Sequence, residues 1–263
     1  HPFTALWKRN GGYKMILLLD AGNSIITIGV HDGRKIIRTF TMETRKIRTK
    51  DEFALFLINM LMLSGIQQES ITGAAIASVV PTVNASLQEA LQEYFRIQPV
   101  IVGPGIRMVI RLKVDNPKEV GADLIADALA AHVKYSGKVL VVNCGTATKY
   151  SVISQDGEFL GVAIAPGFEL GAEGLFRKTA QLPDVGLRIP EEPVGRNSVD
   201  SIASGLYFSY GGGIRQYIEI IREYYGRDMK VILTGGISNH FKEYLRDQID
   251  HWDIHLTLEG LKI

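Results

Sequence analysis

Two short polar turns in this sequence combine an acid or an amide with glycine and hydroxyl residues. They are Asp20-Ala-Gly-Asn-Ser24 and Asn143-Cys-Gly-Thr-Ala147, and each follows an apolar run. Glycine lets the backbone approach a ligand closely, and Ser24, Thr146 and Thr148 offer hydroxyl and N–H groups to phosphate oxygens. An acid at the end of the first run would hold a hydrated cation among those phosphates. The two turns together indicate phosphate binding, although either turn alone is also typical of an ordinary hairpin.

Another candidate for chemistry is Asp123, which lies in a segment with a helical pattern. The spacing predicts a helix over residues 115–134. Asn116 can cap this helix, Pro117 suits its first position and Glu119 completes a capping box. The helix would carry the carboxylate near its N-terminal end.

The small residues before Asp123 favour a functional role for it. Gly121 and Ala122 have little bulk, which makes room for a ligand beside the carboxylate. As a general base, Asp123 would accept a proton from a substrate hydroxyl that attacks a γ-phosphate, a contribution of roughly 10²- to 10⁴-fold. Asp127 shares the same helix face four residues on, and a solvated or capping carboxylate is its preferred interpretation.

The two polar turns belong to a pattern that occurs twice. Residues 15–37 and 139–160 each contain an apolar run, a polar turn, an alternating β-like run and an Asp-Gly pair. The pairs, Asp32-Gly33 and Asp156-Gly157, are strong hairpin signals, because both central residues of a type I′ turn need positive φ. The turns lie 123 residues apart, which is the size of a small domain. The repeat therefore predicts two similar halves.

The predicted domain organisation follows from this repeat. We expect an α/β protein with an N-terminal half at residues 15–135 and a C-terminal half at residues 136–263. Residues 1–14 hold three cations and no acid, and they precede a methionine that opens an apolar run. They are interpreted as a leader or an expression scar and are left out of the fold.

Composition excludes several functional classes. Without residues 1–14, 26 basic residues face 28 acidic ones, which leaves no electrostatic footprint for nucleic acid or for an anionic membrane. Cys144 is the only cysteine, so the chain cannot form a disulfide with itself, and a reducing compartment is expected. No apolar run approaches the roughly 18 residues that span a bilayer. The expectation is a cytoplasmic protein without a nucleic-acid or membrane partner.

A glycine pair ends a further apolar run. Thr234-Gly-Gly236 would let a flat ring or a sugar pack against the backbone, so Gly235 and Gly236 are assigned to adenosine. The sequence contains neither the P-loop pattern nor the third glycine of the dinucleotide-binding fingerprint.

Together, these residues resemble the type III pantothenate kinases, members of the actin-like ATPase superfamily that also holds acetate and sugar kinases. The resemblance runs from Met15 to Ile263. It rests on the ordered motifs Asp20-Ala-Gly-Asn-Ser24, Val102-Gly-Pro-Gly105, Asn116-Pro-Lys-Glu-Val-Gly-Ala-Asp123, Gly145-Thr-Ala-Thr148, Ala163-Ile-Ala-Pro-Gly167, Gly195-Arg-Asn-Ser198, Thr234-Gly-Gly236 and Leu256-Thr-Leu-Glu-Gly-Leu261.

The resemblance implies a fold and an activity. The fold would have two ribonuclease-H-like halves with a central nucleotide cleft. The activity would be ATP-dependent phosphorylation of pantothenate to 4′-phosphopantothenate, the first step of coenzyme A biosynthesis. The implied cofactors are ATP, Mg²⁺ and a monovalent cation, K⁺ or NH₄⁺. The implied assembly is a homodimer whose pantothenate pocket lies near the subunit interface.

The resemblance also implies roles for matching residues. The nucleotide would contact Asp20, Ala21, Gly22, Asn23, Ser24, Thr27, Gly145, Thr146 and Thr148. Pantothenate would contact Val114, Gly121, Ala122, Asp123 and Leu124, and Ser198 would reach it across the interface. Asp123 would be the catalytic base, and the metal ions would be held by Asp20 and Asn143.

Several substitutions separate this chain from the family pattern. Asn143 stands where the family usually has aspartate, so the monovalent-cation site loses a full negative charge. Leu124 replaces an arginine suited to the substrate's carboxylate, and Val114 replaces a common tyrosine. Two alternatives therefore remain open. One is a catalytically weakened or non-catalytic nucleotide-binding relative with a regulatory role, and the other is a kinase for a different small alcohol.

Overall fold

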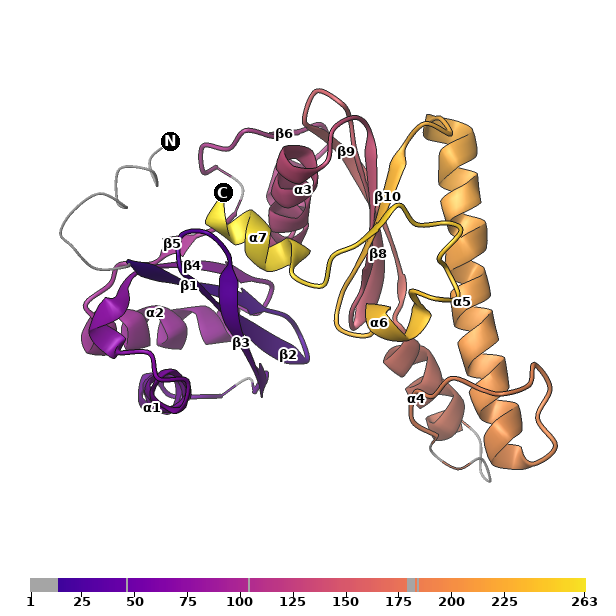
Figure 1. The fold of residues 1–263 in the computed structure, drawn as a ribbon, viewed down its shortest axis with the longest axis horizontal. Helices are drawn as coiled ribbons and strands as arrows, with labels where there is room; N and C mark the ends of the chain where they lie inside the picture. The colour runs from indigo at the N-terminus through magenta and orange to yellow at the C-terminus, as the bar shows by residue number, and fades with distance from the viewer. Residues whose placement is uncertain (1–13, 46, 104, 179–182, 184) are drawn as a thin grey trace. The chain divides into compact units, whose positions relative to one another are not determined.

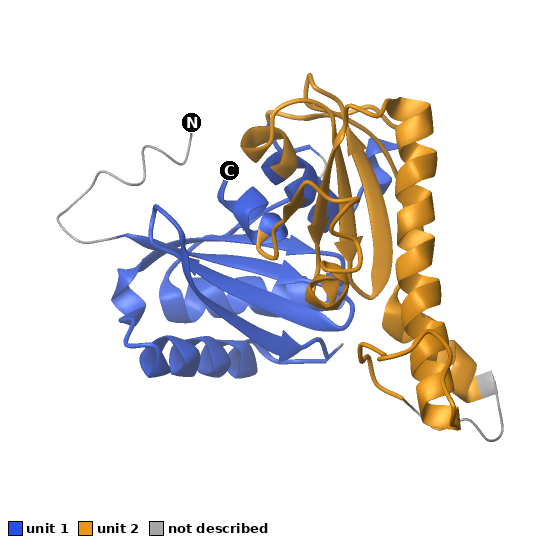
Figure 2. Ribbon diagram, turned by 45° about the vertical axis from the view of Figure 1, so that its right-hand side comes forward, with its two compact units in different colours: residues 1–108, 115–130, 256–263 blue, residues 109–114, 131–255 orange. Residues whose placement is uncertain are grey.

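The computed structural model describes residues 14–45, 47–103, 105–178, 183 and 185–263, which form two compact units (Figure 2). The first unit takes the chain up to Met108, Asp115–Ala130 and Leu256–Ile263. The second takes Val109–Val114 and Ala131–His255. Compared with the expected halves, Val109–Val114 lies in the second unit and Leu256–Ile263 lies in the first. The segment interpreted as a leader lies outside the described residues, apart from Lys14.

The first unit is built on a five-stranded sheet in the order β3-β2-β1-β4-β5 (Figure 1). β1 pairs antiparallel with β2 and β2 with β3, whereas β1, β4 and β5 run parallel. Their bounds are β1 Met15–Ala21, β2 Ile25–His31, β3 Ile36–Glu43, β4 Ile71–Ser78 and β5 Val100–Ile101. The parallel strands β1 and β4 thus end at the same edge of the sheet, and the first polar turn lies at that edge.

Helices cover both faces of this sheet (Figure 1). α1 (Lys50–Leu63) and α2 (Pro81–Phe95) pack their buried side chains against the face that carries Leu17, Leu19 and Ala21. α7 (Leu256–Lys262) contacts β1 and β4, and its Leu258 reaches the backbone at Gly29 on the opposite face. Because side chains alternate along a strand, the side chain of Asp20 projects to the face that α7 covers.

The second unit has a six-stranded sheet in the order β11-β10-β7-β8-β9-β6. Its strands are β6 Arg111–Leu112, β7 Val139–Cys144, β8 Ala147–Ile153, β9 Glu158–Pro166, β10 Lys230–Thr234 and β11 His251–Trp252. The core of this unit lies on one face, where Leu140, Val142 and Tyr150 pack with Ile214 and Ile218. The helices are α4 Phe168–Lys178, α5 Ser198–Tyr225 and the short α6 Ser238–Phe241.

The repeated sequence pattern corresponds to a repeated topology. The order β3-β2-β1-β4-β5 in the first unit matches β9-β8-β7-β10-β11 in the second. The strand directions also match, with two antiparallel pairings followed by two parallel ones. Both Asp-Gly pairs lie at hairpin tips, and Gly33 and Gly157 have positive φ. Among the described residues of the first unit, no strand corresponds to β6.

The helix expected at residues 115–134 begins later than its capping residues suggest. Asn116 caps a short 3₁₀ helix at Pro117–Glu119 instead, and its Oδ1 accepts from Lys118 N–H at 3.3 Å. α3 itself spans Ala122–Lys134. The predicted helix start was therefore wrong, because the cap and proline serve a separate turn. Asp123 lies in the first turn of α3 as a result.

α5 continues through Gly211-Gly-Gly213 without a break. A Cβ at Gly211 would crowd the Tyr244 ring, so close packing explains the absence of a side chain there. Of the helices in the described part of the chain, none combines the length and apolar composition that crossing a bilayer requires.

Candidate functional site

The first polar turn connects β1 to β2 with little freedom. Asp20 lies directly opposite Thr27 in the strand pair, and Ala21 is the last residue of β1. The N–H of Gly22 donates to the carbonyl of Ile25 at 3.1 Å, which closes the turn. A Cβ at Gly22 would lie 3.1 Å from the same oxygen, so a larger residue would crowd it. Asn23 is exposed at the tip and Ser24 is partly buried.

A residue from β3's end fixes the conformation of this turn. The hydroxyl of Thr44 donates to the carbonyl of Gly22 at 2.7 Å, and the N–H of Thr44 donates to the carbonyl of Ser24 at 2.9 Å. Both turn carbonyls are thereby held towards Thr44. Sequence reasoning missed Thr44, since its contact depends on the pairing of β3 with β2 across 22 residues of chain.

The second polar turn connects β7 to β8 and is enclosed by a glycine from β9's end. The N–H of Gly145 donates to the carbonyl of Ala147 at 3.3 Å, and the N–H of Gly167 donates to the carbonyl of Thr146 at 3.1 Å. A Cβ at Gly167 would overlap the carbonyl oxygens of Gly145 and Thr146. Only glycine therefore fits at this position. The motif that contains Gly167 was recognised from the sequence, but this contact was not.

The glycine pair after β10 lies against the same turn. Gly235 has φ of 97°, and a Cβ there would overlap the backbone of Cys144. The N–H of Ile237 donates to the carbonyl of Cys144 at 3.4 Å. The structure thus places the backbone of Gly235 against the second turn, and Gly236 follows it directly in the chain. Their contact with adenosine stays a prediction.

Thr148 differs from the other hydroxyl residues of the turns. Its side chain is buried on the α5 side of the sheet, and its Oγ1 lies 2.7 Å from the hydroxyl of Tyr210. Cys144 is buried beside them, and burial raises the pKa of its thiol to about 12. Cys144 therefore fills space in the core of the second unit. The hydroxyl of Thr148 also lies 3.4 Å from the carbonyl oxygen of Pro166, so both of its described contacts are within the protein and a phosphate contact would involve its backbone.

Asp123 is 7% exposed, in the first turn of α3. Its Oδ1 accepts from the N–H of Leu124 at 2.8 Å. A Cβ at Gly121 would lie 2.7 Å from that Oδ1 and 3.4 Å from a methyl group of Val79. In the direction of this Cβ, the space beside Gly121 is therefore filled by the carboxylate of Asp123 itself. Leu124 is buried, as is Ala122.

Asp127 is not solvated. It is 1% exposed, and its Oδ1 accepts from the hydroxyl of Thr257 on α7 at 2.6 Å. Next to this pair, a Cβ at Gly260 would overlap the carbonyl of Ala126. The expectation of a solvated or capping carboxylate was wrong, because α7 returns from the end of the chain to bury it.

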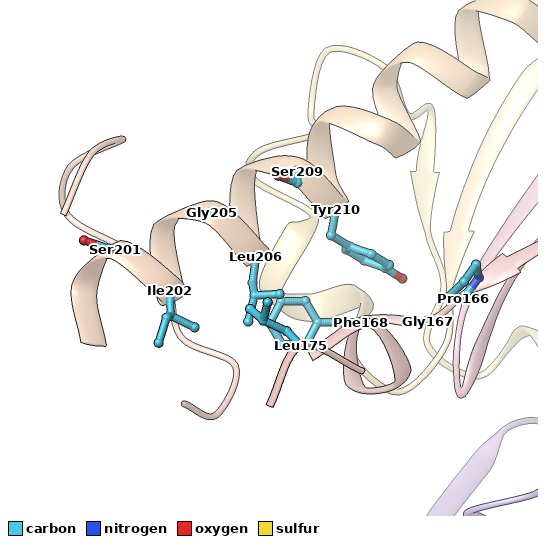
Figure 3. A pocket seen from close by; sticks show the side chains of 11 residues that line it. Pro166, Gly167, Phe168, Leu175, Ser201, Ile202, Gly205, Leu206, Ser209 and Tyr210 are labelled. Atoms are coloured by element: carbon cyan, nitrogen blue, oxygen red, sulfur yellow. The ribbon is translucent and has the colours of Figure 1, made fainter. Parts of the chain in front are cut away.

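A cavity of about 600 Å³ lies in the second unit, between α4, α5 and the end of β9 (Figure 3). Phe168, Leu175 and Leu206 give it apolar walls, and Tyr210 and Pro166 lie at one end. It shares Gly167 with the second turn. Its volume falls within the range of small-molecule sites. The predicted substrate residue Ser198 is exposed at the start of α5, one turn before the lining residue Ser201.

The oxygen ligands that the protein offers near the two turns suit a metal ion held mainly by phosphates and water. Among the described residues, no three His, Cys, Asp or Glu side chains form a metal-binding group. Mg²⁺ in nucleotide sites is held mainly by phosphates and water, with one or two carboxylates. Asp20, at the end of β1 beside the first turn, fits that requirement. Asn143 occupies the equivalent place in β7 but offers only an amide.

The sequence matches the model of one protein family. That family is described as type III pantothenate kinase, and the match covers residues 16–220.

Solved structures share the fold at low sequence identity. A Campylobacter jejuni protein, provisionally described as a Baf family transcriptional activator, has a TM-score of 0.56 at 18% identity, over 94% of this chain and 95% of that chain. The activator of the 2-hydroxyisocaproyl-CoA dehydratase from Clostridium difficile, solved with bound ADPNP, has a TM-score of 0.55 at 10% identity, over 94% and 92%. A Porphyromonas gingivalis protein, provisionally described as an N-acetylglucosamine kinase, has a TM-score of 0.50 at 15% identity, over 94% and 97%. The shared fold is that of the actin-like ATPases and sugar kinases.

Proposed function

The chain belongs to the type III pantothenate kinase family, and on that premise we propose that it transfers the γ-phosphoryl group of ATP to the hydroxyl of pantothenate. The product would be 4′-phosphopantothenate, the first intermediate towards coenzyme A. The observation that carries this proposal is the family match over residues 16–220, which includes both polar turns and Asp123. The ADPNP bound by the Clostridium difficile activator, a protein of the same fold, supports a nucleotide as the ligand.

Each polar turn would contribute to nucleotide binding. The glycines at positions 22 and 145 keep bulk away from the phosphates, and backbone N–H groups with the hydroxyls of Ser24 and Thr146 would donate to phosphate oxygens. Asp20 would hold Mg²⁺, which neutralises charge on the phosphates when it is bound. Thr44 would keep the carbonyls of the first turn directed away from those oxygens, because its hydroxyl and N–H already donate to the carbonyls of Gly22 and Ser24.

Asp123 would act as the base. Its burial removes competing water, and the N–H of Leu124 fixes the rotation of its carboxylate. A fixed carboxylate can accept the proton of the pantothenate hydroxyl as that oxygen attacks phosphorus. In such reactions alignment and charge neutralisation supply most of the remaining rate enhancement.

The acceptor side carries the departures from the family pattern. Gly121, Ala122, Leu124, Val114 and Ser198 remain proposed pantothenate contacts. Leu124 cannot bind the substrate's carboxylate as an arginine would, so another group must do so if pantothenate is the acceptor. A homodimer that completes the acceptor site also remains part of the proposal. Exposed apolar side chains on and before the start of α5, such as Val194 and Val199, support a partner surface there.

A phosphorylation assay tests the proposal. The purified protein is given MgATP with and without pantothenate, and ADP release and phosphopantothenate are measured. ADP release that requires pantothenate supports the proposed reaction. MgATP binding without turnover would favour the non-catalytic alternative. Turnover with a different small alcohol, but not with pantothenate, would favour a different acceptor.

A further inference from the structure

The strand register places Lys149 directly opposite Asn143. In the antiparallel pair β7–β8, Asn143 and Lys149 are Cα partners. The neighbouring strands extend the row, because Asn143 pairs with Thr234 on β10 and Lys149 pairs with Ile164 on β9. Directly opposed residues have Cβ atoms roughly 4.5–5.5 Å apart. The lysine side chain therefore starts beside the amide of Asn143, next to the second polar turn.

This row projects away from the core of the second unit. Val142, Cys144 and Tyr150 belong to the core that packs against α5. Side chains alternate along a strand, so Asn143 and Lys149 project to the other face. Lys149 is partly buried there, at the end of the sheet where the second turn and Gly235 meet. An ammonium at this place lies within reach of an anion bound at the turn.

The equivalent row of the first unit carries the opposite charge. There Asp20 is opposite Thr27, at the matching position of the repeated topology. The first unit thus places an acid opposite a hydroxyl residue in the strand register, whereas the second places a base opposite an amide. A carboxylate at position 143 would offset the charge of Lys149, whereas the amide of Asn143 carries no charge.

These residues fit a bound monovalent cation poorly. Asn143 supplies a neutral amide oxygen, which attracts a cation less strongly than the carboxylate of an aspartate would. The ammonium of Lys149 carries the same charge as K⁺ and starts at the neighbouring position, so the two repel each other. The positions of Asn143 and Lys149 therefore disfavour the K⁺ or NH₄⁺ site that the family resemblance implies.

We propose that Lys149 is a built-in cation of the nucleotide site, whose ammonium binds the phosphates of ATP in place of an added monovalent ion. Lysine is a common phosphate ligand because its ammonium acts as a compact point charge. The inference rests on the proposed nucleotide binding and specifies it further. It follows that neither ATP binding nor phosphorylation requires added K⁺ or NH₄⁺.

Calorimetric titration with MgATP, without acceptor and in a buffer free of K⁺ and NH₄⁺, tests this. The parent is expected to bind equally well when KCl replaces an equal concentration of tetramethylammonium chloride. Lys149→Met should weaken binding by about tenfold or more, since it removes a charged hydrogen-bond donor. Lys149→Arg should retain most of the affinity. Asn143→Asp should also weaken binding, because the new carboxylate pairs with Lys149 while leaving it in place.

The double variant Asn143→Asp, Lys149→Met gives the most specific outcome. It should regain MgATP affinity on addition of KCl, because a carboxylate without the lysine can hold the ion. Lys230→Met is the matched control: Lys230 lies on the same face of the same sheet, four residues before Thr234, and should leave affinity unchanged. Thermal melts establish that each variant folds.

Several results would overturn the inference. They are MgATP affinity in the parent that rises severalfold with KCl, and a folded Lys149→Met variant with the affinity of the parent. A parent that binds MgATP but releases no ADP with pantothenate would refute the proposed reaction, while the affinity comparison would still decide the role of Lys149. A parent that binds no MgATP would refute both.

Discussion

The hydroxyl of Thr257 donates to the carboxylate of Asp127 at 2.6 Å, joining residues 130 positions apart in the chain. This bond links α7 to α3, the helix that carries Asp123 four residues earlier. Thr257→Val removes the donor and leaves a buried carboxylate oxygen without it. We expect a loss of about 1–3 kcal/mol in the free energy of unfolding, measured by urea denaturation. Thr257→Ser keeps the donor and should recover most of the loss. Equal stability of the valine and serine variants would contradict this.

The packing of α7 on α3 depends on Gly260. A methyl group at this position would overlap the carbonyl of Ala126, so Gly260→Ala should destabilise the protein by about 1–3 kcal/mol, the usual cost of overpacking. Gly174→Ala is a suitable control, because Gly174 lies in α4 with open space around it. Alanine there should be neutral or stabilising by up to about 1 kcal/mol. Chemical denaturation of both variants makes the comparison, and similar effects would rule out the proposed close approach.

Thr44 should affect nucleotide binding through the first turn. Thr44→Val keeps the shape but loses the bond to the carbonyl of Gly22, which frees that carbonyl to turn towards the phosphates. MgATP affinity is expected to fall about threefold to tenfold. Thr44→Ser should restore it. Thr72→Val is the control. It removes an exposed hydroxyl on β4, far from the first polar turn, and should leave MgATP affinity unchanged. A valine variant that binds like the parent would remove Thr44 from the site.

Asp123→Asn tests the proposed base. The amide keeps the size of the side chain but cannot accept the substrate proton, so kcat should fall roughly 10²- to 10⁴-fold while MgATP affinity changes little. Asp156→Asn, at the exposed tip of the second hairpin, serves as the control and should retain full activity. A fully active Asp123→Asn variant would contradict the assignment of Asp123 as the base.

Cys144 should make the protein less stable at alkaline pH. Burial raises the pKa of its thiol from 9.0 to about 12. Between these values the unfolded chain loses the thiol proton while the folded chain keeps it, so stability falls as pH rises through this range. The contribution is about 1.4 kcal/mol per pH unit for one proton. Urea denaturation across this pH range should show a shallower decline for Cys144→Ala than for the parent. Parallel declines would mean that the thiol does not titrate differently on unfolding.

Local patterns predicted much of the fold. The Asp-Gly pairs and the alternating runs around them identified both hairpins, because turn chemistry and strand alternation are properties of neighbouring residues. Their repetition predicted the duplicated topology that β1–β5 and β7–β11 display. The start of α3 was misplaced for a related reason. A capping sequence shows that a helical turn begins, but it does not show whether that turn continues into the longer helix.

The sequence by itself determined the family, the two polar turns and the candidate base, since each depends on short motifs of neighbouring residues. The tertiary structure alone decided that Asp127 is buried by α7, that Thr44 holds the first turn and that Lys149 stands opposite Asn143. Each of these relationships depends on strand register or on the return of a distant helix. Many weak contacts spread over the whole unit set those features, and no short segment contains them.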